Sequence, residues 1–382
     1  MGNLDLRDWQ QSALEAWVSN DQRGIVGAVT GGGKTVLALA AIAQAKAHTT
    51  LIVVPTQALL DQWWEEASLF FGLPFDEIRI ITGKAKPRSG TINIAVLNTA
   101  SKLEPRSSDL MLVVDECHKA ASTSFRSILK WKTRASLGLS ATPERPYDDG
   151  LEEVLVPGLG PVIYQYTYED ALRDKVIVPF ELRNVVFDLE KEEAEEYGKL
   201  TRAIARTIQQ EGADSEKAVA LLLKRTRVLN MSLERIKHTI RIAARNRGNR
   251  VLIFHESIEA CRVIHEILSE NGILAGVYHS NLPVRERADM LRAFRNGSVE
   301  MLVTCRALDE GFNVPETEIG IIAASTATRR QRIQRLGRIL RPADGKNRAV
   351  IYSLVATEPE IKRLKVEEAE LEGVADVSWS KA

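Results

Sequence analysis

A glycine-rich segment near the N-terminus carries the residue types that bind phosphate groups. It follows an apolar run, Gly24–Val29, and consists of Thr30, Gly31, Gly32, Gly33, Lys34 and Thr35. Glycines let backbone N–H groups turn inward around phosphate oxygens, and the start of the following helix adds favourable partial charge. The lysine can reach the terminal phosphates, and the last threonine hydroxyl can ligate Mg²⁺. The segment predicts a nucleotide-binding loop of the Walker A kind, although Ala28 stands where such loops usually begin with glycine.

Two adjacent carboxylates, Asp115 and Glu116, follow a second apolar run, Leu110–Val114. On an exposed loop such a pair would be unremarkable. At the carboxyl end of a strand in a protein with a phosphate-binding loop, it is typical of a catalytic site. We expect Asp115 to hold Mg²⁺ through water, and Glu116 to position and deprotonate an attacking water molecule.

The elements that must position these groups alternate between short apolar strands and helical patterns. Continuous apolar runs such as Thr50–Val54 are typical of parallel strands covered on both faces. In the first half we expect further strands at Ile78–Ile81, Ile92–Val96 and Ser136–Leu139, and helices at Leu4–Val18 and Gln57–Phe71. In the second half we expect strands at Val251–Phe254, Gly276–Tyr278, Met301–Thr304 and Ile319–Ala323, and helices at Ile258–Asn271, Val284–Asn296, Arg329–Leu340 and Glu358–Leu371. This alternation predicts doubly wound α/β domains.

Composition narrows the class of protein. A chain of 382 residues with 45% hydrophobic residues is long enough for two packed domains. Its 51 basic and 51 acidic residues balance, so net charge does not favour a nucleic-acid partner, and any basic surface must be local. The three cysteines lie far apart in sequence without a paired spacing, which argues against a zinc site and predicts reduced thiols in a cytoplasmic protein. No apolar run reaches the ~18–20 residues of a membrane span.

Several of these segments together resemble the motifs of superfamily 2 helicases. Motifs I, Ia, Ib, II and III are matched in order by Thr30–Thr35, Pro55–Thr56 with Gln62–Trp63, Asn98–Ser101, Asp115–His118 (Asp-Glu-Cys-His) and Ser140–Thr142. Motifs IV, V and VI are matched in the second half by Val251–Ser257, Thr304–Pro315 and Gln334–Arg341. The resemblance covers nearly the whole chain. The N-terminal Leu-Arg-x-x-Gln and the Gln-Arg-Leu-Gly-Arg of motif VI point to the XPB-like branch, as a minimal two-domain core.

The resemblance implies two tandem RecA-like domains, 1–178 and 179–382, with ATP and Mg²⁺ as ligands and DNA as the partner. It implies that Arg7 and Gln10 contact adenine, whereas their spacing alone favours a solvated polar helix face. Catalysis would also involve Gln334, Arg338 and Arg341, the two arginines lying three apart on one helix face, while Gly311 and Asn313 would bind ATP. His118, Ser140 and Thr142 would couple hydrolysis to movement, and Thr56, Thr99 and Thr304 would contact the nucleic-acid backbone. Asn313 departs from the aspartate that many relatives carry there.

The segment 189–246 is helical in pattern and rich in charge, and XPB-like proteins carry a DNA-contacting thumb near this place. Arg225 and Arg227 would then bind DNA. The alternative is an amphipathic hairpin whose basic residues neutralise the acidic run Glu190–Glu196. The adjacent Trp63 and Trp64 we interpret as packing residues and not as base-stacking platforms.

The leading hypothesis is an ATP-dependent DNA helicase or translocase. An RNA-directed helicase, and the motor subunit of a restriction or phage-defence complex that acts with a nuclease or other partner, stay open as alternatives.

Overall fold

The computed structural model describes residues 5–74, 77–83, 87–104, 109–142, 150–305, 314, 316–324, 337 and 339–382. The chain divides into two compact units, of which the first contains Met1–Val176 and the second contains Ile177–Asp309 with Asn313–Ala382. The division falls close to the domain boundary that we expect from the sequence. Within the described ranges, no helix is long and apolar enough to cross a membrane.

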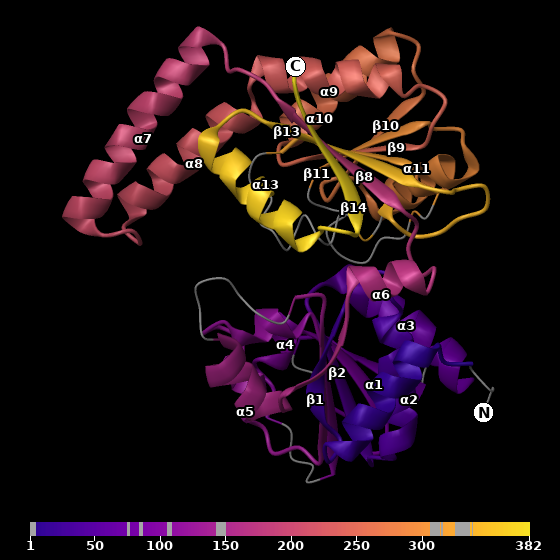
Figure 1. The fold of residues 1–382 in the computed structure, drawn as a ribbon. Helices are drawn as coiled ribbons and strands as arrows, with labels where there is room; N and C mark the ends of the chain where they lie inside the picture. The colour runs from indigo at the N-terminus through magenta and orange to yellow at the C-terminus, as the bar shows by residue number, and fades with distance from the viewer. Residues whose placement is uncertain are drawn as a thin grey trace. The chain divides into compact units, whose positions relative to one another are not determined.

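The first unit is a sheet of seven parallel strands in the order β3-β4-β2-β5-β6-β1-β7, with helices packed against it (Figure 1). The strands are β1 Arg23–Ala28, β2 Thr49–Val54, β3 Ile78–Ile81, β4 Ile92–Val96, β5 Leu110–Asp115, β6 Ala135–Ser140 and β7 Val162–Tyr166. The helices are α1 Asp8–Ser19, α2 Lys34–Ala45, α3 Gln57–Phe71, α4 Leu97–Ala100, α5 Val156–Leu159 and α6 Tyr168–Arg173. Every residue of β2, β5 and β6 is buried, as continuous apolar runs in a parallel sheet predict.

The second unit repeats this architecture with the order β10-β11-β9-β12-β13-β8-β14, again all parallel. Its strands are β8 Phe180–Val186, β9 Val251–His255, β10 Ala275–His279, β11 Met301–Cys305, β12 Ile319–Ile322, β13 Ala349–Val355 and β14 Ala375–Lys381. Its helices are α7 Lys191–Glu211, α8 Glu216–Asn230, α9 Leu233–Arg245, α10 Ile258–Glu270, α11 Val284–Asn296 and α13 Glu358–Glu370. The sequence patterns predict neither β13 nor the edge strand β14.

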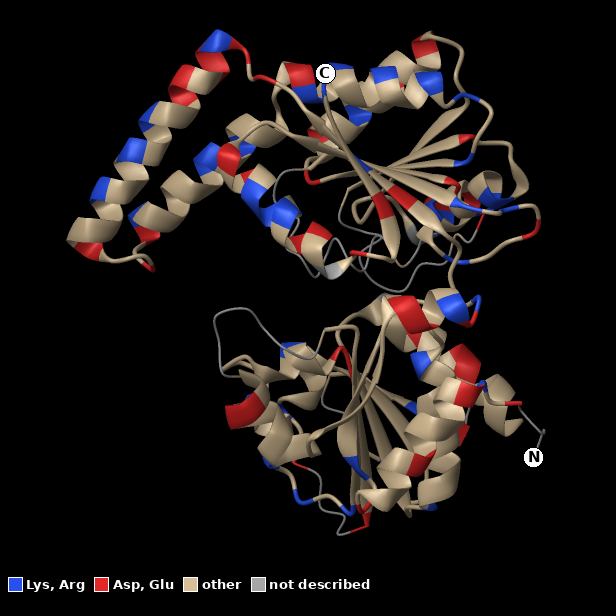
Figure 2. Ribbon diagram, in the orientation of Figure 1, with Lys and Arg blue, Asp and Glu red and all other residues tan. Residues whose placement is uncertain are grey.

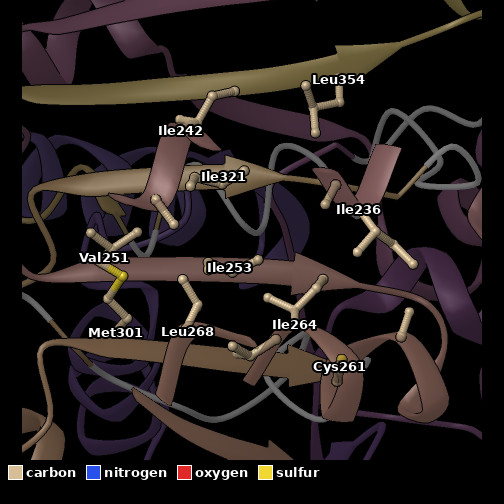
Figure 3. Packing of buried hydrophobic residues seen from close by; sticks show 14 of the residues in the cluster. Ile236, Ile242, Val251, Ile253, Cys261, Ile264, Leu268, Met301, Ile321 and Leu354 are labelled. Carbon is tan, nitrogen blue, oxygen red and sulfur yellow. The ribbon is translucent and has the colours of Figure 1, made fainter. Parts of the chain in front are cut away.

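The helical segment 189–246 is not one inserted body. Helices α7 and α8 form a hairpin that extends away from the sheet, and they are the helical insertion (Figure 1). Helix α9 instead belongs to the core of the second unit. Figure 3 shows its Ile236 and Ile242 packed with Ile253 of β9 and Ile264 of α10. The predicted insertion is therefore too long at its C-terminal end, because α9 packs Ile236, Ile242 and Ala243 into the hydrophobic core of this unit.

A buried arginine, Arg235 of α9, ties the hairpin to the core. Its guanidinium donates to the carbonyl oxygens of Leu229 at 2.8 Å and Leu354 at 2.7 Å, and pairs with Glu360 of α13 at 2.8 Å. It also lies over the ring of Phe187, 5.1 Å from the ring centroid. Leu229 lies in the last turn of α8, so one side chain joins the base of the hairpin, strand β13 and helix α13.

Glu360 is equally well satisfied. Its other oxygen accepts from the backbone N–H groups of Ala356 at 2.9 Å and Thr357 at 3.0 Å, and from the Thr357 hydroxyl at 3.0 Å. Burial alone would raise the pKa of Glu360, but the Arg235 guanidinium and these hydrogen bonds outweigh it and hold the pKa below its usual value. The pair is thus ionised and fully hydrogen-bonded inside the protein.

We predict that Arg235→Met lowers the free energy of unfolding of the second unit by about 3–5 kcal/mol, because it leaves the Glu360 carboxylate buried without its counter-ion. The matched control is Lys217→Met, which breaks the exposed pair between Lys217 and Glu211 (2.9 Å) and should cost about 0–1 kcal/mol. Denaturant unfolding monitored by circular dichroism measures both. Equal losses in the two variants would contradict the anchoring role of Arg235.

Candidate nucleotide-binding and catalytic site

The glycine-rich loop between β1 and α2 adopts backbone conformations that require glycine. Gly31 has φ 88° and Gly33 has φ 103°, both in the left-handed region. A Cβ atom on Gly33 would lie 2.6 Å from Nε2 of Gln10, whereas real Cβ atoms do not approach other atoms so closely. The local sequence therefore matches the loop geometry at the two positions where only glycine is unstrained.

Arg7 and Gln10 both hold this loop from outside. The Arg7 guanidinium donates to the carbonyl oxygen of Gly32 at 3.1 Å, and Gln10 Nε2 donates to the carbonyl oxygen of Gly33 at 2.9 Å. The Arg7 backbone N–H donates to Gln10 Oε1 at 2.9 Å, which closes a capping box at the start of α1. Helix α1 begins at Asp8, so Arg7 is its extended N-cap residue and not part of the helix that the sequence predicts from Leu4. Contact with adenine stays a prediction.

An aromatic stack behind the loop was not predicted from the sequence. Trp9 of α1 stacks on Tyr166 at the end of β7, with ring centroids 4.5 Å apart and planes 15° apart. A Cβ atom on Gly32 would lie 3.6 Å from the Tyr166 ring and 3.7 Å from the Trp9 ring. Tyr166 donates its hydroxyl to Asp174 Oδ2 at 3.0 Å, and burial together with this contact raises its pKa. The aromatic residues of β7 were the signal that could have located this strand beside the loop.

The start of α2 presents groups that fit a nucleoside triphosphate with Mg²⁺. Gly33 is the N-cap residue, so within the described residues no side chain caps the first turn, and the backbone N–H groups there are available to an anion. Lys34 lies in that turn and donates to the carbonyl oxygen of Ala28 at 2.9 Å. The Thr30 hydroxyl is buried and has no hydrogen-bond partner in the described part of the chain. Thr35 follows Lys34 in the same turn.

The acidic pair lies two strands away from the loop, at the same edge of the sheet. Strand β6 lies between β1 and β5, and β5 ends at Asp115. Asp115 Oδ1 accepts from the Glu116 backbone N–H and Oδ2 accepts from the indole N–H of Trp63, both at 2.9 Å. Glu116 has φ 47° and ψ 49°, a left-handed conformation that is rare for a non-glycine residue. Such strain in a buried residue is characteristic of functional sites.

The predicted coupling residues form a continuous set of contacts with the acidic pair. His118 Nδ1 lies 2.9 Å from the Ser140 hydroxyl and 3.4 Å from Glu116 Oε2. The Ser140 hydroxyl oxygen in turn accepts from the Thr142 backbone N–H at 3.1 Å. Because β5 and β6 are neighbouring strands, residues more than twenty positions apart are brought to one edge. The structure thus places a path of polar groups from Glu116 to the segment after β6.

The threonines predicted to contact nucleic acid lie at or just after the carboxyl ends of strands. Thr56 follows β2 and is the N-cap residue of α3, and Thr99 lies in α4 directly after the neighbouring strand β4. Both therefore lie at the strand-end edge that carries the loop and the acidic pair. In the second unit, Thr304 lies near the end of β11, and its buried hydroxyl has no hydrogen-bond partner among the described residues.

Most of the predicted residues of motifs V and VI lie outside the described residues. These are Gly311, Asn313, Gln334 and Arg338. Arg341 is described, and it lies in a bend beyond the helical residue Ile339. Arg341 itself therefore lies outside the helix, because Pro342 disfavours the helical conformation in the residue before it. Whether Arg341 shares a helix face with Arg338, which lies outside the described residues, stays a prediction.

A buried lysine that was not predicted holds this bend. Lys346 donates to the carbonyl oxygens of Ile339 and, at 2.8 Å, Arg341. Burial lowers the pKa of Lys346 to about 8, against the opposing attraction of Glu318 and Glu316. The Arg341 backbone is thus fixed by hydrogen bonds from one ammonium group.

The basic residues of segment 189–246 divide into two groups. Figure 2 shows basic and acidic residues interspersed along α7. Arg225 lies over the Tyr197 ring at 5.5 Å, and Arg227, whose side chain is 76% exposed, lies 3.5 Å from Glu259. Lys237 contacts Glu190 at 3.3 Å and Glu234 at 2.7 Å. For Lys237 the structure thus favours the neutralising role, whereas Arg225 and Arg227 remain candidates for DNA contact.

Comparison with known families gives two matches along the chain. Residues 3–145 match the family described as Type III restriction enzyme, res subunit, and residues 232–343 match the family described as helicase conserved C-terminal domain. The two matched stretches contain the nucleotide-binding loop, the acidic pair and the segment that ends at Arg341.

Several known proteins are similar over most of this chain. The DNA 3'-5' translocase XPB2 of Sulfurisphaera tokodaii is 29% identical over 372 residues, which cover 89% of this chain and 80% of that protein. The putative DNA 3'-5' helicase Rad25 of Haloarcula marismortui is 29% identical, over 97% of this chain and 56% of that protein. The DNA 3'-5' helicase XPB of Kineococcus radiotolerans is also 29% identical, with 92% of this chain covering 60% of it. The chain thus spans little more than half the length of the last two relatives.

Solved structures with the same fold share little sequence with this chain. Dbp5 of S. cerevisiae bound to RNA and ADP BeF3 has a TM-score of 0.59 at 15% identity, over 98% of this chain and 89% of that chain. The ATP-dependent Type ISP restriction-modification enzyme LlaBIII bound to DNA has a TM-score of 0.67 at 14% identity, over 99% of this chain and 31% of that chain. These likenesses confirm the predicted fold: tandem RecA-like domains with parallel sheets and a helical insertion.

We predict that Gly33→Ala weakens nucleotide binding by about tenfold or more, because a residue forced into this conformation is strained by about 1–3 kcal/mol and Gln10 must move the amide that binds the Gly33 carbonyl oxygen. The matched control is Gly72→Ala at the end of α3, where φ is 62° but a Cβ would meet no atom within 4 Å. The control also places an alanine in the left-handed region, but away from the loop, and it should bind nucleotide as the wild type does. Titration of a fluorescent ADP derivative measures both dissociation constants. Equal affinities in the two variants would contradict the loop assignment.

Proposed function

Because the chain belongs to superfamily 2 of the helicases, we propose that it hydrolyses ATP and couples the hydrolysis to movement along DNA. The observation that carries the proposal is the assembly at one edge of the first sheet. There the neighbouring strands β5, β6 and β1 bring together the glycine-rich loop, the acidic pair and Ser140.

The nucleotide would be held by the first unit. The backbone N–H groups of the loop and the Lys34 ammonium bind the phosphates, while Arg7 and Gln10 present their remaining donors and acceptors to adenine. Thr35 and Asp115 would hold Mg²⁺, which would neutralise phosphate charge. The buried Thr30 hydroxyl, which has no partner among the described residues, is a further group that a phosphate oxygen would satisfy.

Glu116 is the general base in this proposal. It directly follows the last residue of β5, and its contact with His118 connects it to Ser140 on the next strand. A base in this position accepts a proton from the water that attacks the terminal phosphate. The contacts through His118 and Ser140 would carry the state of the nucleotide to Thr142 and the segment that follows it.

The second unit supplies charge stabilisation in this proposal. Guanidinium groups suit the charge that develops on a transferring phosphoryl group, since their planar donors bind two oxygens at once. We assign this role to Arg338 and Arg341, with Gln334 orienting water, and we assign Gly311 and Asn313 to nucleotide contact. These assignments rest on the resemblance of their segments to motifs V and VI.

DNA is the proposed track, with 3'-5' movement, because the similar proteins named above are DNA 3'-5' translocases and helicases. Thr56 and Thr99 follow the neighbouring strands β2 and β4, and β2 lies next to β5, which ends in the acidic pair. Hydroxyl and backbone N–H groups there would contact phosphates, so binding should depend little on base sequence and strongly on salt.

A second candidate function is the motor of a restriction complex that acts with a nuclease partner. It is favoured by the match of residues 3–145 to the res subunit family of Type III restriction enzymes. Purification from the native host under mild salt, followed by a DNA cleavage assay, distinguishes the two. Stoichiometric recovery with a nuclease favours the complex, and recovery of an active single chain favours the autonomous motor. In either case the chain is a reduced, cytoplasmic protein in our proposal.

We predict that single-stranded or duplex DNA stimulates ATP hydrolysis by the wild type more than RNA does. Glu116→Gln should bind ATP with wild-type affinity and lose nearly all turnover, because the amide keeps the shape of the carboxylate but cannot accept a proton. A phosphate-release assay with each nucleic acid, alongside nucleotide titration, measures these effects. Turnover within twofold of wild type in Glu116→Gln would rule out the general base, and stimulation by RNA alone would rule out the DNA motor.

The hairpin gives a prediction that separates DNA contact from charge neutralisation. Replacing Arg225 and Arg227 with Gln should flatten the plot of log DNA affinity against log salt by about 0.7–0.9 for each phosphate that the protein no longer neutralises. Lys237→Gln should leave this slope unchanged, because Glu190 and Glu234 already engage its ammonium group. Fluorescence anisotropy at several salt concentrations gives the slopes. An unchanged slope in the double arginine variant would show that the hairpin does not grip DNA.

A further inference from the structure

Trp63 of α3 donates a hydrogen bond to Asp115, the residue of the acidic pair that we assign to Mg²⁺. We propose that Trp63 is the positioning residue that orients Asp115 for Mg²⁺. The inference rests on the proposed function, because it needs Asp115 to hold the ion.

The geometry of the contact is fixed at both ends. The indole N–H of Trp63 donates to Asp115 Oδ2 at 2.9 Å, and the backbone N–H of Glu116 donates to Asp115 Oδ1 at 2.9 Å. Trp63 is completely buried and Asp115 is 7% exposed. One donor comes from a helix and the other from the chain directly after the strand, and each binds a different carboxylate oxygen. Together they fix the plane of the carboxylate, and each oxygen keeps a lone pair for a further partner.

The indole also suits this position chemically. It is a donor only, so it cannot exchange roles with the carboxylate or accept a proton from it. It carries no charge, so it directs Asp115 without competing with a cation for the site. A hydrogen bond from a neutral donor to an ionised acceptor in a buried site is among the stronger ones in proteins.

Packing alone would not require a tryptophan here. The neighbouring buried positions on the same helix, Leu60 and Ala67, are apolar and fill the interior without any polar atom. A phenylalanine at position 63 would serve the same purpose. The indole N–H needs a buried acceptor, and the acceptor it uses is the carboxylate that motif II assigns to Mg²⁺. The interpretation of Trp63 as a packing residue is therefore correct but incomplete.

The position of Trp63 along α3 adds a route from the nucleic-acid contact to the ion. Helix α3 is capped by Thr56, whose hydroxyl accepts from the Leu59 backbone N–H, and Trp63 follows two turns later. The helix is thus joined to Asp115 at one point and begins at a predicted phosphate contact.

The chain offers a closely matched control. Trp17 of α1 is 1% exposed, and its indole N–H donates to the carbonyl oxygen of Ser136 at 2.9 Å, likewise buried. Trp17→Phe and Trp63→Phe each remove the same atoms of an indole ring and one buried hydrogen bond of the same length. Only in Trp63→Phe is the lost hydrogen bond one to a carboxylate. A loss of stability should therefore appear in both variants, and a change at the magnesium site in one.

The test is the gain in nucleotide affinity that Mg²⁺ provides, which needs no turnover. A fluorescent ADP derivative is titrated against the full chain with Mg²⁺ and with EDTA. The readout is the dissociation constant in EDTA divided by the dissociation constant in Mg²⁺. We expect Trp63→Phe to reduce this ratio by about tenfold relative to wild type, from the typical strength of a hydrogen bond to a charged group. Trp17→Phe should keep the wild-type ratio. Asp115→Asn should lose the gain, and Trp63→Phe should add nothing in that background.

A wild-type ratio in Trp63→Phe overturns the positioning role, and so does an equal reduction in Trp17→Phe. An effect of Trp63→Phe that persists in the Asp115→Asn background also overturns it, because the effect would then bypass the carboxylate. If the wild type itself shows no gain with Mg²⁺, the magnesium assignment within the proposed function fails instead.

Discussion

Parallel pairing of strands is the constraint on which the rest of this structure depends. In a parallel sheet every strand ends at the same edge, so residues far apart in sequence meet there if their strands are neighbours. The first unit orders its central strands β5-β6-β1, and these end in the acidic pair, in Ser140 and in the glycine-rich loop. The neighbours β4 and β2 end before Thr99 and Thr56. The predicted nucleotide and nucleic-acid contacts therefore share one edge without sharing residues.

The same edge concentrates strain and buried polar groups, which the fold must offset elsewhere. Glu116 has a left-handed backbone, which is strained for a residue other than glycine, and His118 is fully buried. Side chains from other elements hold the groups at this edge: Gln10 contacts the loop, Ser140 contacts His118, and Trp63 contacts Asp115. The buried strands and helices around them provide the rigid surroundings that keep such conformations in place. The second unit shows the same principle where Arg235 and Glu360 satisfy each other inside the core.

Much of the fold could be predicted because buried parallel strands leave a strong pattern. The runs at Leu110–Val114 and Val251–Phe254 are apolar throughout, and the structure confirms them as strands. The sequence patterns do not predict strand β14, because polar and apolar residues alternate along it and none of its residues is fully buried. It is the last strand of its sheet and, among the described strands, pairs with β8 alone. Helix α9 was assigned to the insertion because its exposed face is basic, although Ile236 and Ile242 already gave it an apolar face. Pro342 was the signal that Arg341 lies outside the helix.

In the candidate site too, some contacts can be predicted from the sequence and others cannot. Residue types and motif order predict which groups meet at the strand ends, because pairing of neighbouring strands requires it. They do not predict Trp63 at Asp115, Trp9 on Tyr166, or Lys346 at the Arg341 carbonyl, because these contacts depend on how a helix or a loop packs in three dimensions. Hydrogen-bond partners of buried side chains are a tertiary property, and no local pattern encodes them.

The most direct test of the proposed nucleotide site is the structure of the protein crystallised with Mg²⁺ and a non-hydrolysable ATP analogue. We expect the β- and γ-phosphates within hydrogen-bond distance of the Lys34 ammonium and the backbone N–H groups of residues 31–35. We expect Mg²⁺ at Thr35, with a bound water reaching an Asp115 carboxylate still held by Trp63. A nucleotide bound elsewhere, or an ion remote from both Thr35 and Asp115, would contradict the proposed site.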